Sequence, residues 1–185
     1  MKKLLAFLLV LSMIISFVGC TAKKSVDGPE SALVLLENVW AKYQDGEKFS
    51  AAGGDFSEEN QRMDAPGKYS LEDKEALAST FCLDAETAAL VDDAASLMHM
   101  MLANNFTAVA LHVTDVQDTE KVTKSLKENI QNNRWLCGFP EEMYIATVGN
   151  YVISVFGASD LVLVFDTHLK EAYADTQVVF QEPIA

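Results

Sequence analysis

The chain has 185 residues, with 27 Asp or Glu side chains against 14 Lys or Arg, so its formal net charge is −13. No basic patch offsets this acidity, which argues against nucleic acid as a partner. The length suits one domain with a sizeable core. Half of the residues are apolar, and many of these lie near the N-terminus.

The N-terminal residues are typical of an export signal. Lys2 and Lys3 precede an apolar run over residues 4–18, which is too short for a comfortable membrane span. The run ends in Phe-Val-Gly-Cys at residues 17–20, which resembles a lipobox, where bacteria attach diacylglycerol to a cysteine and cleave just before it. The predicted organisation is a lipoprotein signal peptide over 1–19, a lipidated Cys20 with a tether over 20–29, and a single domain over 30–185.

This N-terminus predicts where the protein resides. Cleavage before Cys20 would remove Lys2 and Lys3 and change the formal charge of the mature chain to −15. Charge would then not hold the protein to an anionic membrane, so the lipid would have to do so. We expect an extracytoplasmic protein that is anchored to the cell membrane by its N-terminal lipid.

The first half of the domain is predicted to be mostly helical. A helix is expected from a cap at Asp27 to a stop at Gly46, and an irregular segment follows over residues 47–68. A short helix over 70–78 and a longer one from Asp84 to about Ala103 come next. The apolar face of the first helix comprises Ala32, Leu35, Leu36, Val39, Trp40 and Tyr43.

The second half predicts the order β-α-β-β-α-β. Strands are expected over 106–113, 143–148, 151–156 and 176–181, and helices over 118–132 and 159–173. Gly149 and Asn150 form a hairpin turn signal. The expected fold class is therefore α+β: a ferredoxin-like βαββαβ antiparallel sheet with two helices on one face and the N-terminal helices covering the other.

Four segments carry a resemblance to a known family. They are residues 92–101 (Asp-Asp-Ala-Ala-Ser-Leu-Met-His-Met-Met), 105–107 (Asn-Phe-Thr), 135–140 (Trp-Leu-Cys-Gly-Phe-Pro) and 148–151 (Val-Gly-Asn-Tyr). Together they resemble an uncharacterised domain-of-unknown-function family of extracytoplasmic lipoproteins from Gram-positive anaerobes. The resemblance implies the same cellular location and implies no active site.

Two cysteines remain after lipidation of Cys20, namely Cys82 and Cys137. In an exported domain they are candidates for a disulfide, for two buried thiols, or for a thiol-dependent activity, and spacing does not decide among these.

Other polar groupings indicate no catalytic site. Asp92, Ser96 and His99 share one side of the predicted long helix, an arrangement that does not supply the geometry of a hydrolase triad. His112 and His168 have no ligand partner nearby in sequence and are interpreted as structural. No metal, nucleotide or other cofactor motif is present.

The sequence therefore predicts a non-enzymatic binding or assembly module with an unidentified protein or small-molecule partner and no cofactor. The alternative is a thiol-dependent redox accessory or other enzyme that uses Cys82 and Cys137. A binding surface is expected on two loops, because recognition is often carried by loops on a rigid scaffold. Its candidate residues are Gly53, Gly54, Asp55, Trp135 and Phe139.

Overall fold

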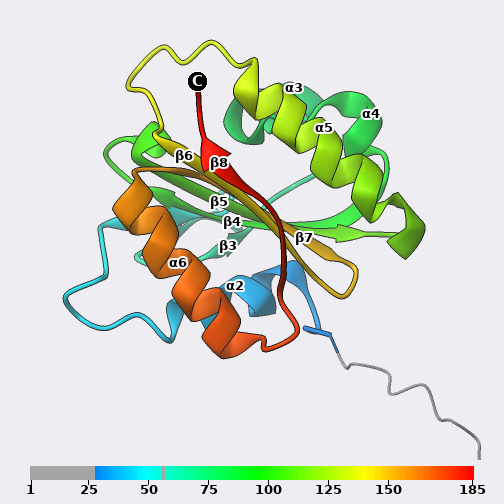
Figure 1. The fold of residues 1–185 in the computed structure, drawn as a ribbon. Helices are drawn as coiled ribbons and strands as arrows, with labels where there is room; N and C mark the ends of the chain where they lie inside the picture. Colours follow the sequence, from blue (N-terminus) through cyan, green and yellow to red (C-terminus); the bar gives the residue numbers. More distant parts are fainter. Residues whose placement is uncertain (1–27, 56) are drawn as a thin grey trace, which may run out of the picture.

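The computed structural model describes residues 28–55 and 57–185, which form a mixed α+β fold around an eight-stranded antiparallel sheet (Figure 1). The predicted signal peptide and the predicted lipidation site Cys20 lie outside the described residues. The helices are α2 (Ala32–Trp40), α3 (Lys74–Phe81), α4 (Ala85–Ala88), α5 (Thr119–Gln131) and α6 (Ser159–Ala172). The strands are β1 (Ala51–Gly53), β2 (Arg62–Met63), β3 (Gly67–Lys68), β4 (Val91–His99), β5 (Phe106–Val113), β6 (Glu142–Val148), β7 (Tyr151–Gly157) and β8 (Gln177–Pro183).

The sheet has helices on both faces. Figure 1 shows α2 and α6 on one face and α3, α4 and α5 on the other. Each face has its own apolar core: α2 and α6 cover Ala95, Phe106 and Ile153, whereas α3, α4 and α5 cover Leu111 and Val152. Strands that are apolar on both sides require two covers, and here each cover combines an N-terminal helix with one from the second half of the chain.

The order of the strands differs from the predicted ferredoxin-like arrangement. The sheet runs β2-β1-β4-β5-β7-β6-β8, so β8 pairs with β6, while β4 occupies the other side of β5. The β5-α5-β6 and β7-α6-β8 connections therefore move the same way across the sheet, although β5 and β7 are antiparallel. Right-handed crossovers then place α5 and α6 on opposite faces, which corrects the prediction that they share one.

The predicted long helix from Asp84 to Ala103 is wrong over most of its length. Only α4 is helical, capped by the side chain of Asp84, and the chain then enters β4. Alanine, leucine and methionine favour helices, but propensity is a weak term that tertiary packing overrides. Residues 94–98 of β4 are buried, and the strand lies between β5 on one edge and β1 and β3 on the other.

The other predicted helices and strands are present, but they begin or end at different residues than predicted. In α2, the predicted residues Ala32, Leu35, Leu36, Val39 and Trp40 are buried. Its observed N-cap is Ser31, whose hydroxyl accepts a hydrogen bond from the Val34 amide at 3.1 Å, and Asp27 lies outside the described residues. Residues 47–68, predicted as irregular, contain the three short strands β1, β2 and β3. Within the described ranges, no helix combines the length and apolarity needed to cross a bilayer.

Glycines allow β1 and β3 to meet beside β4. A methyl group at Gly53 would overlap backbone atoms of Ala65, Pro66 and Gly67. Ser96 of β4 lies under the same contact, where its hydroxyl accepts a hydrogen bond from the Gly54 amide at 3.0 Å. The small residues of this region are therefore required by backbone contact.

The close contact at Gly53 predicts a large effect of adding one carbon atom. Gly53→Ala should lower the free energy of unfolding by about 1–3 kcal/mol, because the backbone must shift to admit the methyl group. Gly46→Ala is the matched control: nothing lies within 4 Å of the added carbon, so the change should stay within about 0.5 kcal/mol. Urea unfolding of both variants measures this, and equal effects would contradict the packing account.

A buried histidine joins α6 to the segment between α2 and β1. His168 is 5% exposed, and its Nε2 lies 2.8 Å from Glu47 Oε2 while its Nδ1 lies 3.0 Å from Glu171 Oε2. Burial opposes the charged imidazolium, but hydrogen bonds and charge from Glu171 and Glu47 outweigh it, so the pKa of His168 is raised above its ordinary value. The structural interpretation of this histidine fits these contacts.

The raised pKa of His168 predicts a pH dependence with a definite sign. The stabilisation should be fully present below the unfolded-state pKa of about 6.5 and should be lost as the pH rises through the folded-state pKa. Wild type should therefore lose more stability than His168→Gln between pH 6 and pH 9 in urea unfolding. Parallel pH profiles for the two proteins would contradict the ionic account.

Candidate functional site

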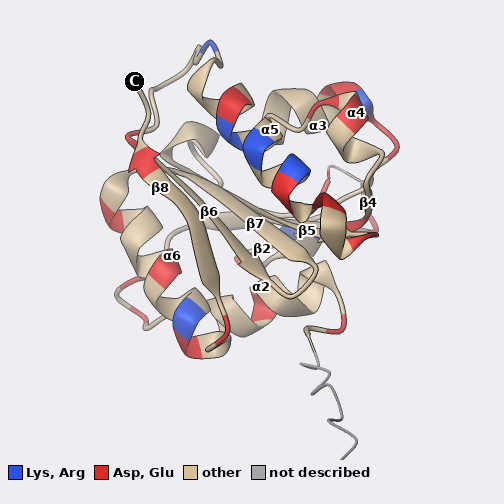
Figure 2. Cartoon of the chain, turned by 45° about the vertical axis from the view of Figure 1, so that its right-hand side comes forward, with Lys and Arg blue, Asp and Glu red and all other residues tan. Residues whose placement is uncertain are grey.

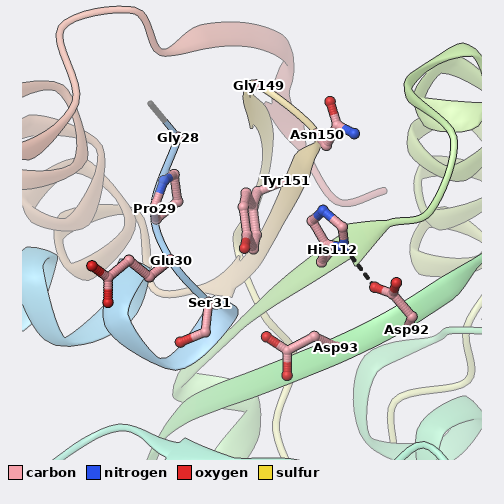
Figure 3. A pocket seen from close by; sticks show the side chains of 10 residues that line it. All are labelled: Gly28, Pro29, Glu30, Ser31, Asp92, Asp93, His112, Gly149, Asn150 and Tyr151. Carbon is pink, nitrogen blue, oxygen red and sulfur yellow. Dashed lines mark hydrogen bonds and ion pairs between the residues drawn. The ribbon is translucent and has the colours of Figure 1, made fainter. Parts of the chain in front are cut away.

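A concave site lies at the end of the sheet where α2 begins. It has a volume of about 690 Å³ and is formed by residues 28–31, two carboxylates of β4, His112 of β5 and the β6–β7 turn. Figure 3 shows that these segments surround the side chain of Tyr151. We call this the α2-end pocket. Its volume lies within the range of small-molecule sites.

A bulge in β4 supplies the two adjacent carboxylates. The pairing of β4 with β5 shifts register between Val91 and Asp93, and such a bulge redirects side chains that would otherwise point to opposite faces. Both Asp92 and Asp93 therefore line the pocket. Asp93 Oδ2 also accepts a hydrogen bond from the Ala32 amide at 2.8 Å, which joins the bulge to the start of α2.

His112 and Asp92 form a pair at one wall. His112 Nδ1 lies 2.5 Å from Asp92 Oδ1, as Figure 3 shows by a dashed line. A proton on Nδ1 satisfies this contact and fixes the imidazole orientation. The ring of His112 also packs against that of Tyr151, with centroids 4.8 Å apart.

Tyr151 is the central side chain of the site. The residue is only 7% exposed, and Figure 3 shows its hydroxyl pointing toward Ser31 and Asp93. Within the described part of the chain, that hydroxyl makes no hydrogen bond. Burial, together with the charges of Asp93 and Asp92, raises the pKa of Tyr151, so the phenol stays protonated at neutral pH.

The two loops of the predicted binding surface lie in different parts of the fold. The Asp55 carboxylate accepts hydrogen bonds from the Ser57 amide at 2.9 Å, the Asn60 side-chain amide at 2.8 Å and the Ser70 amide at 3.0 Å. Burial raises its pKa, but these hydrogen bonds and that of the Ser57 hydroxyl outweigh burial and hold the pKa of Asp55 at about 2. Gly53, Gly54 and Asp55 therefore have structural contacts that account for them.

The second loop joins α5 to β6. Trp135 packs against Phe156 with ring centroids 4.9 Å apart and belongs to the core under α5. Phe139, by contrast, is 59% exposed. The predicted binding surface thus divides into a structural glycine turn, a partly buried tryptophan and an exposed phenylalanine.

The two cysteines of the described chain are free thiols, so no Cys82–Cys137 disulfide is present. Cys82 ends α3 in a left-handed conformation and is buried, and burial raises its pKa to about 11. Cys137 is exposed in the loop before β6. A thiolate reaction at neutral pH would therefore depend on Cys137 alone.

Sequence reasoning missed the residues that form the pocket. The structure separates Asp92 and His99, which lie toward opposite ends of β4, while Ser96 contacts Gly54 between them. Asp92 instead meets His112, which was interpreted as structural. The Asp92–Asp93 pair and the Gly149–Asn150 turn were visible in the sequence, but only the correct assignment of β4 as a strand brings them to one end.

In the described part of the chain, no group of three His, Cys, Asp or Glu side chains is arranged to hold a metal ion. Comparisons with protein-family models, with curated proteins and with solved structures found no match. The site is therefore interpreted from its own geometry.

The different burial of the two thiols predicts their reactivity. Under native conditions at pH 8, an alkylating reagent should modify Cys137 within seconds to minutes, whereas Cys82 should react only after unfolding, at least about a hundredfold more slowly. Intact mass of residues 21–185, followed over time, measures this. Rapid native labelling at Cys82, assigned with Cys137→Ser, would contradict the burial of that thiol.

Proposed function

We propose that the protein is a membrane-anchored, extracytoplasmic lipoprotein and a non-enzymatic binding module, with its ligand site in the α2-end pocket. The observation that carries this proposal is Tyr151: a side chain more than nine-tenths buried presents an unused hydroxyl to an open cavity. The hydroxyl itself reaches the cavity that Tyr151 lines, so a bound ligand can exchange a hydrogen bond with it. The other groups around the cavity are also suited to recognition.

The proposed anchor favours this location for a binding site. If Cys20 carries the lipid, the eight peptide bonds between Cys20 and Gly28 span at most about 29 Å, and Gly28 itself lines the pocket. The site would then remain close to the membrane surface. The lipobox and the resemblance to extracytoplasmic lipoproteins support this part of the proposal.

The thiol-dependent alternative has weaker support. It needs two cooperating cysteines or one activated cysteine, and the burial of Cys82 disfavours its thiolate. Neither cysteine lines the α2-end pocket. The binding hypothesis therefore accounts for more of the structure.

The anchoring part of the proposal predicts the effect of removing one sulfur atom. Cys20→Ala should prevent lipid attachment, so that most of the exported protein no longer partitions with membranes. Cys137→Ala removes a different thiol from the same chain and should leave partitioning unchanged. Fractionation after salt and carbonate washes measures both, and equal membrane retention of the two variants would contradict the lipid anchor.

The binding part is tested by a small panel of cationic, neutral and anionic compounds. The proposal expects saturable binding by at least one chemical class, with NMR shifts at Tyr151 and His112. If no class perturbs these residues at millimolar concentration, the pocket is not the binding site. Turnover of a compound by the Asp92–His112 pair would favour an enzyme instead.

A further inference from the structure

We propose that the α2-end pocket binds an organic ammonium cation through the carboxylates of Glu30, Asp92 and Asp93 and through Tyr151. This inference rests on the proposed function and names the ligand class of the same site.

The charge of the pocket is strongly one-sided. Three carboxylates line it, with no Lys or Arg, and His112 is the one basic side chain among its lining residues. The lysines of α5, which form blue bands in Figure 2, lie on the opposite face of the sheet. Lys121, Lys124 and Lys127 are each paired with a glutamate, and Lys68 lines a neighbouring hollow that shares Asp92 and Asp93.

The carboxylates keep free acceptor capacity. A carboxylate has about four lone-pair sites, whereas Asp93 uses one for the Ala32 amide and Asp92 one for His112. Glu30 lies on the exposed segment before α2. An ammonium group offers up to three N–H donors, which match several acceptors around one cavity.

Tyr151 adds a second, independent feature that suits a cation. Its hydroxyl oxygen can accept a hydrogen bond from an ammonium group, while its ring packs against His112 and the core that α2 covers. Because the phenol stays neutral, its proton remains available to a hydroxyl or carbonyl elsewhere on the ligand. A carboxylate cluster alone would not specify this combination.

An anion fits the site poorly. The start of α2 points into the pocket, and a helix N-terminus generally attracts anions. Here, however, Asp93 accepts from the Ala32 amide and Ser31 accepts from the Val34 amide. The protein has therefore placed its own acceptors at this terminus and surrounded it with further negative charge.

An organic cation also fits better than a metal ion. The described carboxylates do not converge in a metal-binding group, and the cavity of about 690 Å³ is far larger than one ion needs. A compact diamine can instead contact carboxylates on separate walls. The pocket is also lined by the partly apolar residues Tyr151 and Pro29.

The test uses three probes of matched length: 1,4-diaminobutane as the cation, 1,4-butanediol as the neutral analogue and succinate as the anion. The protein is tested as residues 21–185 and as the lipidated mature form that begins at Cys20, in detergent. We expect 1,4-diaminobutane to bind saturably, with NMR shifts at Tyr151 and His112, and at least tenfold more tightly than either analogue. Calorimetry of the same samples gives the affinities.

Two conservative point substitutions then test whether the binding takes place in the pocket. Tyr151→Phe removes only the hydroxyl, and Glu30→Gln removes a charge from an exposed segment, so neither depends on refolding a core. Each should weaken 1,4-diaminobutane binding about five- to tenfold, in keeping with the loss of a charge-assisted hydrogen bond. Glu75→Gln on α3, which packs on the other face, should leave the affinity unchanged.

The outcomes distinguish a failure of the cation assignment from a failure of the proposed binding function. Tighter binding of succinate or 1,4-butanediol at Tyr151 would overturn the cation assignment and leave the binding function standing. Equal weakening in Glu75→Gln would show a non-specific effect of net charge and also overturn it. Binding by none of the three probes would overturn the assignment and count against the pocket itself.

Discussion

Strand β4 is held on both edges and buried through its centre, and this burial constrains most of the neighbouring structure. β5 pairs with it on one side, while β1 and β3 share its other edge. The helices on the two faces then cover Ala94 and Ala95, which belong to different cores. A strand in this position needs small residues where backbones meet, and Ser96 beside Gly54 and Gly67 satisfies that requirement.

The same strand connects packing to the proposed function. The central part of β4 is regular, but the bulge before Asp93 interrupts the pairing at the end where α2 begins. Asp93 then binds the Ala32 amide, and Asp92 meets His112. The contact that positions α2 therefore also leaves a cavity in which Tyr151 is exposed to a ligand. Removing the bulge would alter the docking of the helix and the shape of the site together.

The sequence predicted the elements whose pattern is local. The strand over 106–113, the hairpin at Gly149 and the helix over 118–132 follow from periodicity and turn chemistry, and the structure confirms them. β4 could not be predicted in this way, because its Ala, Leu and Met side chains favour a helix, and only pairing with neighbouring strands on both edges makes it a strand. The face of the sheet that α6 covers likewise depends on which strand pairs with β8, and long-range contacts determine that pairing.

The candidate site was less predictable than the fold, since it joins residues 28–31, 92–93, 112 and 149–151. We infer that Tyr151 and the carboxylates of this site hold an organic cation. The most direct measurement is a crystal structure of the protein soaked with 1,4-diaminobutane. The account predicts density for one ammonium group within hydrogen-bond distance of both Tyr151 Oη and the Asp93 carboxylate. Ligand bound elsewhere, or a pocket closed by the protein's own side chains, would contradict it.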